Sequence, residues 1–223
     1  MEDSGMVKRY RLDEVAKIKE GKIVPREEYF TNVGLPLVTA EYLKQLMLNG
    51  DIEQVPKVNM VFNKCLKCAP VPAKTIILTR AHLKETNKYI YQCENEVCIA
   101  NDVVAIMPNE TIILSDYLLH FLSWYPIKEW HHLYHILIDI PMIDIQHKVV
   151  QLLNTIQLLL KNKESLITAV EGLPQHFDKF SRQIENHSQH LQHGLNQVHY
   201  FYDVMLHKIF KGELYKEMHG SEL

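Results

Sequence analysis

This 223-residue chain has few of the sequence features that mark disordered, membrane-spanning, secreted or disulfide-rich proteins. It has only 8 glycines and 9 prolines, and 47% of its residues are hydrophobic, so a disordered chain is not expected. No apolar run approaches the roughly 20 residues that span a bilayer. The opening MEDSG is acidic and polar, unlike a secretory leader. Four cysteines then fit a reducing compartment better than a disulfide framework. We therefore expect a folded cytoplasmic protein without membrane association.

The chain also lacks an excess of positive charge. Its formal net charge is −3. Residues 1–145 hold 16 Lys and Arg against 19 Asp and Glu, and residues 146–223 hold 8 of each. Charge alone therefore does not predict nucleic-acid binding. A local basic face is still compatible with this balance, provided that acidic clusters lie on the far side.

No catalytic motif is present either. Gly21-Lys22 lacks the upstream glycine of a phosphate loop, and the chain has no nucleophile elbow and no His-Glu-x-x-His pair. The Asn/Asp-Pro-Pro-aromatic tetrapeptide that adenine methyltransferases place around a flipped base is missing as well. We interpret the chain as non-catalytic and expect no cofactor.

The sequence changes character at Pro141. Before it, short runs rich in β-branched residues alternate with turn residues. The predicted strands cover 35–38, 75–79, 89–91, 97–100, 103–106 and 136–140. Helices are predicted over 39–48, and over 115–124 with Ser115 or a neighbour as N-cap and Pro126 beyond its end. This pattern predicts a mixed α/β domain over residues 1–144.

After Pro141, apolar positions recur at alternating spacings of four and three. The first series is Ile145, Val149, Leu152, Ile156, Leu159, Lys163, Leu166 and Val170. The second is Phe177, Phe180, Ile184, His187, Leu191, Gly194, Val198, Phe201 and Met205. The seam is imperfect, because Lys163, His187 and Gly194 lie on it. Heptads of this length nevertheless predict coiled-coil pairing. Gly172-Leu-Pro174 interrupts them, which leaves a kinked continuous helix or a helical hairpin as alternatives.

The expected fold class is therefore α+β. The mixed α/β domain would be followed by a helical dimerisation region over 145–216 and a short tail over 217–223.

Three motifs of the C-terminal part resemble the specificity subunits of Type I restriction–modification systems. Residues 138–153, IDIPMIDIQHKVVQLL, resemble the exit from a target-recognition domain, where an apolar-Pro-apolar step precedes a Gln that opens a long helix. Residues 170–183, VEGLPQHFDKFSRQ, resemble the middle of the helical spacer in some members. Residues 205–214, MLHKIFKGEL, resemble the end of that spacer, which finishes in Phe-x-Gly-Glu-Leu.

The N-terminal part resembles the same family more loosely, and in the same order. Residues 12–22 resemble its opening stretch, and residues 29–38 resemble its strand with an apolar-Pro-apolar step. Residues 72–80, PAKTIILTR, resemble the strand after a Pro-x-Gly turn, with Ala73 or Lys74 in place of the glycine. The family usually has another glycine soon after this strand, where this chain continues Ala-His-Leu-Lys, so the resemblance does not predict the geometry of that loop.

The resemblance covers nearly the whole chain and implies a half-length specificity subunit, with one target-recognition domain and one helical spacer. It implies double-stranded DNA and a modification (methyltransferase) subunit as partners, and leaves open a restriction subunit. It further implies a homodimer through the spacer, or pairing with another specificity chain. The alternative from a different class is a coiled-coil scaffold with an α/β head and no DNA role, which the acidic head favours.

Candidate DNA-contacting residues are the basic and amide side chains of the predicted loops. They are Lys22, Arg26, Lys44, Asn63, Lys64, Lys67, Thr79, Arg80, Lys84, Lys88 and Asn101. Arginine and lysine supply phosphate contacts or bidentate hydrogen bonds to guanine, and asparagine suits adenine. Each is individually more often a solvated surface residue. Arg80 is the preferred candidate, because the resemblance places it where a strand ends at the domain edge.

The cysteines and one histidine group are weighed as metal ligands. Cys65-x-x-Cys68 and the wider pair Cys93 and Cys98 have a spacing that zinc can use, and a zinc-dependent regulator is a third, weaker hypothesis. We prefer the interpretation that the second pair is buried on adjacent strands and the first lies in a loop. His131, His132 and His135 alternate with apolar residues and are expected in a packed segment. No metal is therefore predicted.

Overall fold

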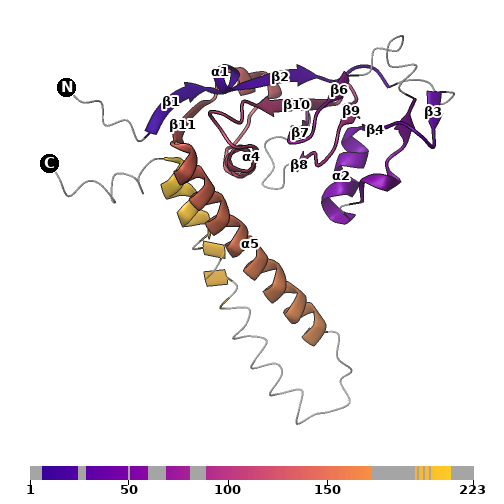
Figure 1. The fold of residues 1–223 in the computed structure, drawn as a ribbon. Helices are drawn as coiled ribbons and strands as arrows, with labels where there is room; N and C mark the ends of the chain where they lie inside the picture. The colour runs from indigo at the N-terminus through magenta and orange to yellow at the C-terminus, as the bar shows by residue number, and fades with distance from the viewer. Residues whose placement is uncertain are drawn as a thin grey trace, which may run out of the picture. The chain divides into compact units, whose positions relative to one another are not determined.

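The computed structural model describes residues 7–24, 29–49, 51–59, 69–80, 89–171 and 202–211, and the positions 194, 196, 197, 199 and 200. The chain divides into two compact units, Met1–His147 and Lys148–Leu223, which are described separately. The predicted α+β class is confirmed, because strands and short helices come first and the long helix α5 (Ile143–Glu171) follows (Figure 1).

A four-stranded antiparallel sheet forms the first layer of unit one. Its order is β2 (Ala16–Glu20), β10 (Val103–Pro108), β7 (Ile76–Thr79) and β8 (Ile90–Gln92). The helix α4 (Ser115–Trp124) contacts β8 and β10. Because successive side chains of a strand point to opposite faces, Val103 and Ala105 of β10 join one core cluster while their buried neighbours face the other way.

A second sheet has five short strands. Its order is β3 (Phe30–Thr31), β5 (Lys57–Val58), β4 (Leu35–Val38), β9 (Val97–Ile99) and β6 (Ala69–Val71), and only β4 and β9 pair in parallel. The helix α2 (Ala40–Asn49) and the 3-10 helix η2 (Ile52–Gln54) connect β4 to β5. Leu43 and Leu46 of α2 pack in one core with Val71, Val97 and Ala105, so this core joins the two sheets.

The first and last strands of unit one pair with each other. β1 (Val7–Arg11) is antiparallel to β11 (Leu137–Pro141), and Arg9 holds Asp139 through two hydrogen bonds of 2.6 and 2.7 Å. The short helix α1 (Leu12–Val15) follows β1 and contacts the 3-10 helix η3 (Trp130–His135). The chain therefore enters and leaves this unit on adjacent strands.

Most predicted elements are present at their predicted places. The helix α4 has the predicted bounds, and its N-cap residue is Leu114, next to Ser115. Leu114 offers no capping side chain, and Glu110 instead accepts the backbone N–H of Ser115 at 2.9 Å. The prediction missed β1 and β2, which carry many charged residues, and β3, β5 and β6, which have only two or three residues each.

The helical part contains two segments that contact each other. The helix α5 (Ile143–Glu171) begins at the end of unit one, and residues 202–210 of unit two are helical. The Gln157 side-chain amide donates to the Tyr202 hydroxyl at 2.8 Å, 45 positions later in the chain. The chain therefore turns back between them, as a hairpin does and a kinked continuous helix does not. Residues 172–174, the predicted break, lie outside the described residues, and coiled-coil pairing stays a prediction.

The buried seam of α5 differs from the prediction by one position. Val149 and Ile156 are buried as predicted, but Leu152 is 41% exposed, whereas Leu153 and Leu160 are buried. Apolar residues occur here in adjacent pairs, so the sequence is compatible with two heptad registers. In the structure the buried positions follow a 4-3-4 spacing that includes Leu153. The side chain of Leu159, and those of the series from position 162 onward, lie outside the description.

The second helical segment shows the same one-position difference. Met205, which the prediction placed on the seam, is half-buried, whereas Leu206, Ile209 and Phe210 are buried. Residues 177–191 of the predicted series, and positions 198 and 201, lie outside the described residues. No helix within the described ranges combines the length and apolar character needed to cross a membrane.

Candidate nucleic-acid interface

Three strand ends of the four-stranded sheet meet at one edge. The strand β10 is antiparallel to both of its neighbours, and its start pairs with their ends: Val104 is opposite Glu20 of β2, and Val103 is opposite Thr79 of β7. The ends of β2 and β7 and the start of β10 therefore lie next to one another at this edge. We call this edge the strand-end corner, formed by residues 20–22, 79–80 and 100–103.

Gly21 allows the chain to cross from β2 to the second sheet. Its N–H donates to the Val103 carbonyl at 3.1 Å. A Cβ at this position would lie 1.7 Å from the Ala100 carbonyl oxygen, so any residue other than glycine would displace the backbone. The backbone N–H of Lys22 then donates to the Ile99 carbonyl at 3.3 Å, and Lys22 forms an isolated parallel β-bridge with Ala100. The position of Lys22 beside the start of β10 is thus fixed by the backbone.

Arg80 is held at the corner on several sides. Its backbone N–H donates to the Asp102 carbonyl at 2.9 Å, and its guanidinium donates to the Asn101 carbonyl at 3.0 Å. The same guanidinium lies 3.5 Å from the Glu20 carboxylate and 4.3 Å from the centre of the Trp130 ring. Such contacts fix the orientation of a planar cation while its side chain remains 33% exposed.

The start of α2 is attached to the same corner. The Asp102 carboxylate accepts the Ala40 N–H at 2.9 Å, where a negative charge also interacts favourably with the helix dipole. Further along α2, the Lys44 ammonium lies 5.7 Å from the centre of the Tyr89 ring. The backbone carbonyl of Tyr89 accepts the backbone N–H of Thr79 at 3.2 Å, which connects Lys44 to the end of β7.

The structure therefore brings together several of the predicted contact residues. Lys22, Arg80 and Asn101 lie at the corner, and Lys44 lies near it on α2. Thr79 also lies there but is only 2% exposed, so its side chain is poorly placed to contact a ligand. Six further candidates lie outside the described residues: Arg26, Asn63, Lys64, Lys67, Lys84 and Lys88.

Sequence reasoning missed the partners that hold these residues. Glu20 and Asp102 are acidic, and neither they nor Trp130 are among the residues that the sequence predicts at the interface. The pairing of β2 and β7 with β10 brings them together, and no local pattern in the sequence signals that pairing. With Lys22 and Arg80 opposed by two acids, the corner carries little net charge.

The cysteine pairs do not assemble within the described residues. Cys65 and Cys68 lie outside them. Cys93 and Cys98 are buried, yet in different core clusters, because Cys93 follows β8 of one sheet and Cys98 lies on β9 of the other. The expectation that they lie on adjacent strands is therefore wrong. Burial raises the pKa of Cys93 to about 12, which opposes the thiolate that zinc binding requires.

The histidine group lies on η3. His131, His132 and His135 are exposed there, and Leu133 is the only buried residue of the element, so the expected packed segment is instead a surface turn of helix. Within the part of the chain that the structure describes, no cluster of three or more His, Cys, Asp or Glu could hold a metal ion.

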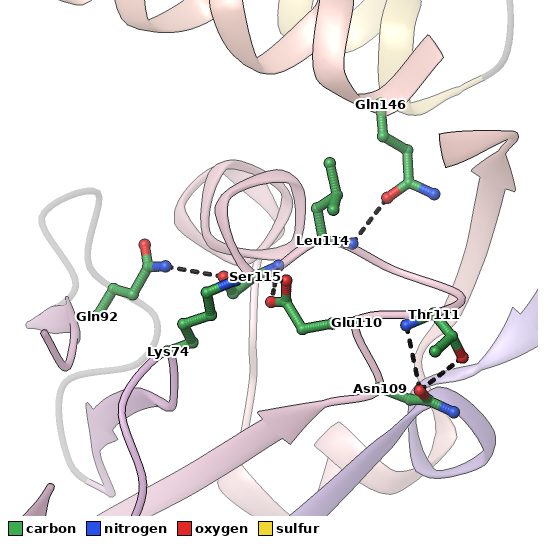
Figure 2. A network of polar contacts seen from close by, with 8 residues as sticks. All are labelled: Lys74, Gln92, Asn109, Glu110, Thr111, Leu114, Ser115 and Gln146. Carbon is green, nitrogen blue, oxygen red and sulfur yellow. Dashed lines mark hydrogen bonds and ion pairs between the residues drawn. The ribbon is translucent and has the colours of Figure 1, made fainter. Parts of the chain in front are cut away.

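A second polar network surrounds the exit from unit one (Figure 2). The Gln146 side chain is fully buried and makes three hydrogen bonds: its oxygen accepts the Leu114 N–H at 2.8 Å, and its NH₂ donates to the Ile112 and Pro141 carbonyls at 2.9 and 2.8 Å. Gln146 thus joins the first turn of α5 to the end of β11 and to the loop before α4.

Glu110 extends this network to the β6–β7 turn. One oxygen of its carboxylate accepts the Ser115 N–H, and the other forms an ion pair with the Lys74 ammonium at 3.0 Å. Burial acts to raise the pKa of Glu110, but the hydrogen bonds from Lys74 and Ser115 outweigh it and lower the pKa. Lys74 has φ of 64°, a left-handed conformation that favours glycine, so Lys74 occupies the glycine place of the Pro-x-Gly turn.

Comparison with known proteins gives structural neighbours only. No family model matches the sequence, and no curated protein matches it. Among solved structures, the chain is similar to the HsdS subunit from Thermoanaerobacter tengcongensis, with 16% identity, a TM-score of 0.48, and coverage of 95% of this chain and 46% of that one.

Two further neighbours have comparable values. One is a chain from a study of complex assembly and conformational transition of the type I R-M system, with 13% identity, a TM-score of 0.48, and coverage of 93% of this chain and 46% of that one. The other is the Type-I restriction-modification system S subunit from M. genitalium, with 12% identity, a TM-score of 0.44, and coverage of 78% and 45%. The chain spans less than half the length of each of these neighbours.

Proposed function

We propose that unit one is a DNA target-recognition domain and that the helices form the spacer of a half-length Type I specificity subunit. The observation that carries the proposal is the strand-end corner, where Lys22, Arg80 and Asn101 come together from three segments far apart in the sequence. The ordered motifs of the exit and of the spacer end support the same assignment, since they resemble that family.

Each group at the corner has a suitable chemistry. Lys22 is exposed and offers a point charge for a phosphate oxygen, and the exposed Asn101 amide can pair in a bidentate way with adenine. Arg80 is pre-oriented by Trp130 and the Asn101 carbonyl, and its remaining N–H groups can reach a guanine edge or a phosphate. The corner would thereby read one half of a two-part DNA site.

The helices would set the distance to the second half-site. A partner spacer, from a second copy or from another specificity chain, would place a second recognition domain on the DNA. The modification subunit would dock on the helices and supply the adenine-flipping pocket that this chain lacks. A restriction subunit could join the same assembly.

The test is co-expression of the full chain with a modification subunit encoded beside it. Co-purification is followed by an adenine-methylation assay on random-sequence DNA. The expected result is methylation at a two-part, near-palindromic site, which would support both the recognition role and the dimer. The matched variant Asn101→Ala should change the sequence that is methylated, while Asn154→Ala on α5 should not.

A coiled-coil scaffold without a DNA role is the second candidate. It is favoured by one observation, since Glu20 and Asp102 offset the positive charges of the corner. A stable chain that neither binds the modification subunit nor supports methylation would select this alternative. Binding to duplex DNA at increasing salt also separates the two, because phosphate contacts make affinity fall steeply with salt.

A further inference from the structure

Positive charge is concentrated in residues 7–22 of this acidic chain. This stretch carries six Lys and Arg against three Asp and Glu, whereas the rest of the chain carries 18 against 24. Electrostatic binding surfaces depend on local charge rather than on the net charge of the protein. The stretch comprises β1, α1, β2 and the crossing at Gly21, so it leads into the strand-end corner.

Within this stretch, the arginines and the lysines differ in their partners. Arg9 pairs with Asp139 and Arg11 with Asp13. Like Lys8 on β1, the three lysines at positions 17, 19 and 22 form no ion pair with an acid anywhere in the described ranges. We call these three the lysine row. Together with Lys8, they are the basic residues of the stretch that no ion pair compensates.

The backbone holds the lysine row in a fixed order. Lys17 and Lys19 are two positions apart on β2, so their side chains point to the same side at a spacing of about 6.6 Å. Glu20 points to the opposite side and lies near Arg80. The Lys19 ammonium donates to the Pro70 carbonyl at 2.7 Å, and the Gly21 crossing fixes Lys22. Among the described strands, β2 lies at the edge of its sheet and has a neighbour, β10, on one side only.

The Lys19 ammonium lies close enough to Lys17 and Lys22 for their positive charges to act on it. Burial lowers the pKa of Lys19, and the positive charges of Lys17 and Lys22 lower it further. A bound anion would relieve this repulsion. Lys17 and Lys22 are exposed, so an anion can reach them from solvent.

We infer that the lysine row binds the phosphate backbone of duplex DNA and thereby places the Asn101 amide against base edges. This inference rests on the proposed function and deepens it, since it assigns sequence-independent contacts to β2 and leaves base reading to the corner. An extended row of point charges suits successive phosphates. Its continuity with Asn101, through the Lys22–Ala100 bridge, favours DNA over an acidic protein as the occupant.

The experiment measures how the affinity of the full chain for a mixed-sequence DNA duplex depends on salt. The variant is Lys17→Gln, Lys19→Gln and Lys22→Gln combined. Since each phosphate contact contributes about 0.9 to the slope of log affinity against log salt concentration, the slope should fall by about 2 to 3. In the methylation assay, the methylated sequence should stay the same while the yield falls.

A matched control removes the same charge elsewhere. Lys128, Lys148 and Lys211 are exposed and lie outside the row, and their combined change to Gln should leave the slope nearly unaltered. The double variant Lys17→Gln and Lys22→Gln keeps the Lys19–Pro70 bond, so it should lose about 2 units of slope even where the triple variant is unstable. Replacing the row with three arginines should restore the slope, because the charge is retained.

Two results would overturn the inference while leaving the proposed function in place. One is an unchanged slope in both the triple and the double variant. If these variants also lost binding to the modification subunit, the row would instead bind an acidic protein surface. The other is an equal loss of slope in the control, which would indicate general attraction rather than contact. A wild-type chain without salt-dependent DNA binding would instead overturn the proposed function itself.

Discussion

The side-chain oxygen of Gln146 accepts the backbone N–H of Leu114 at 2.8 Å, although 32 positions separate the two residues. Leu114 is the N-cap of α4, and Gln146 lies in the first turn of α5. A single buried amide therefore satisfies main-chain groups at the start of one helix while it anchors the start of another. Its NH₂ group donates to two further main-chain groups, the Ile112 and Pro141 carbonyls.

Replacing this amide should destabilise unit one. Gln146→Leu keeps a similar volume but leaves one N–H and two carbonyl groups without their partner. We expect the free energy of unfolding to fall by at least about 2 kcal/mol, because each unsatisfied buried group costs about 1–3 kcal/mol. Urea unfolding measures the change. Gln151→Leu, at an exposed position of the same helix, should change it by less than about 0.5 kcal/mol. Equal effects would show that the bonds contribute little.

Substitutions of Arg80 and Asn101 should have different effects on the stability of the fold and on DNA recognition. Arg80→Ala removes a hydrogen bond and the contact with Trp130, so the free energy of unfolding should fall by about 1–2 kcal/mol. Asn101→Ala leaves the carbonyl that Arg80 uses, so it should unfold like the wild type. Under the proposed function it should nevertheless weaken discrimination at one base pair by about 1–3 kcal/mol. Unfolding and DNA binding are measured on both variants, and a destabilised Asn101 variant would contradict this division.

The buried thiol of Cys93 should make stability depend on alkaline pH. An unfolded cysteine loses its proton near pH 8.5, whereas burial raises the folded pKa to about 12. Above pH 8.5 the unfolded chain therefore binds fewer protons than the folded one, and stability falls as pH rises. The expected loss is about 2 kcal/mol at about pH 10.

Cys93→Ala provides the comparison for this prediction, since both proteins share all other alkaline groups. The difference in unfolding free energy between the wild type and the variant should shrink by that amount from about pH 7.5 to about pH 10. A difference that is independent of pH would mean that the folded thiol ionises as readily as the unfolded one.

The corrected seam of α5 gives a matched pair of substitutions. Leu153 is fully buried and Leu152 is 41% exposed. Leu153→Ala should lower the unfolding free energy by about 2–5 kcal/mol, because it removes buried methyl groups and leaves a cavity. Leu152→Ala should cost less than about 1 kcal/mol. Thermal unfolding of both variants checks this, and the reverse order would restore the register predicted from the heptads.

Local signals in the sequence were enough to predict the elements that bury most of their residues. The strands β7, β9 and β10 are apolar runs between turn residues, and α4 is bounded by an N-terminal serine and a following proline. In contrast, β1 and β2 read VKRYR and AKIKE. Their charged residues hide the strand pattern, because each is an edge strand whose pairing with a distant partner is what stabilises it.

The candidate site could be predicted in part. Lys22, Arg80 and Asn101 were identified from residue type and loop position. That they lie together could not be predicted, since it depends on the register of β10 with two strands from other parts of the chain. The acidic partners of Arg80 and of α2 were missed for the same reason. The heptad register was ambiguous because adjacent apolar pairs satisfy two spacings equally.

The pairing of β1 with β11 has a consequence for how such a domain can be exchanged. Because Val7 lies opposite Pro141, the points of entry and departure are neighbours rather than opposite ends of the fold. Everything between them can be replaced as one cassette while both junctions stay where they are, provided that the replacement also begins and ends on two paired strands. Under the proposed function, such an exchange would change the DNA sequence that is read and leave the helices that follow unaltered.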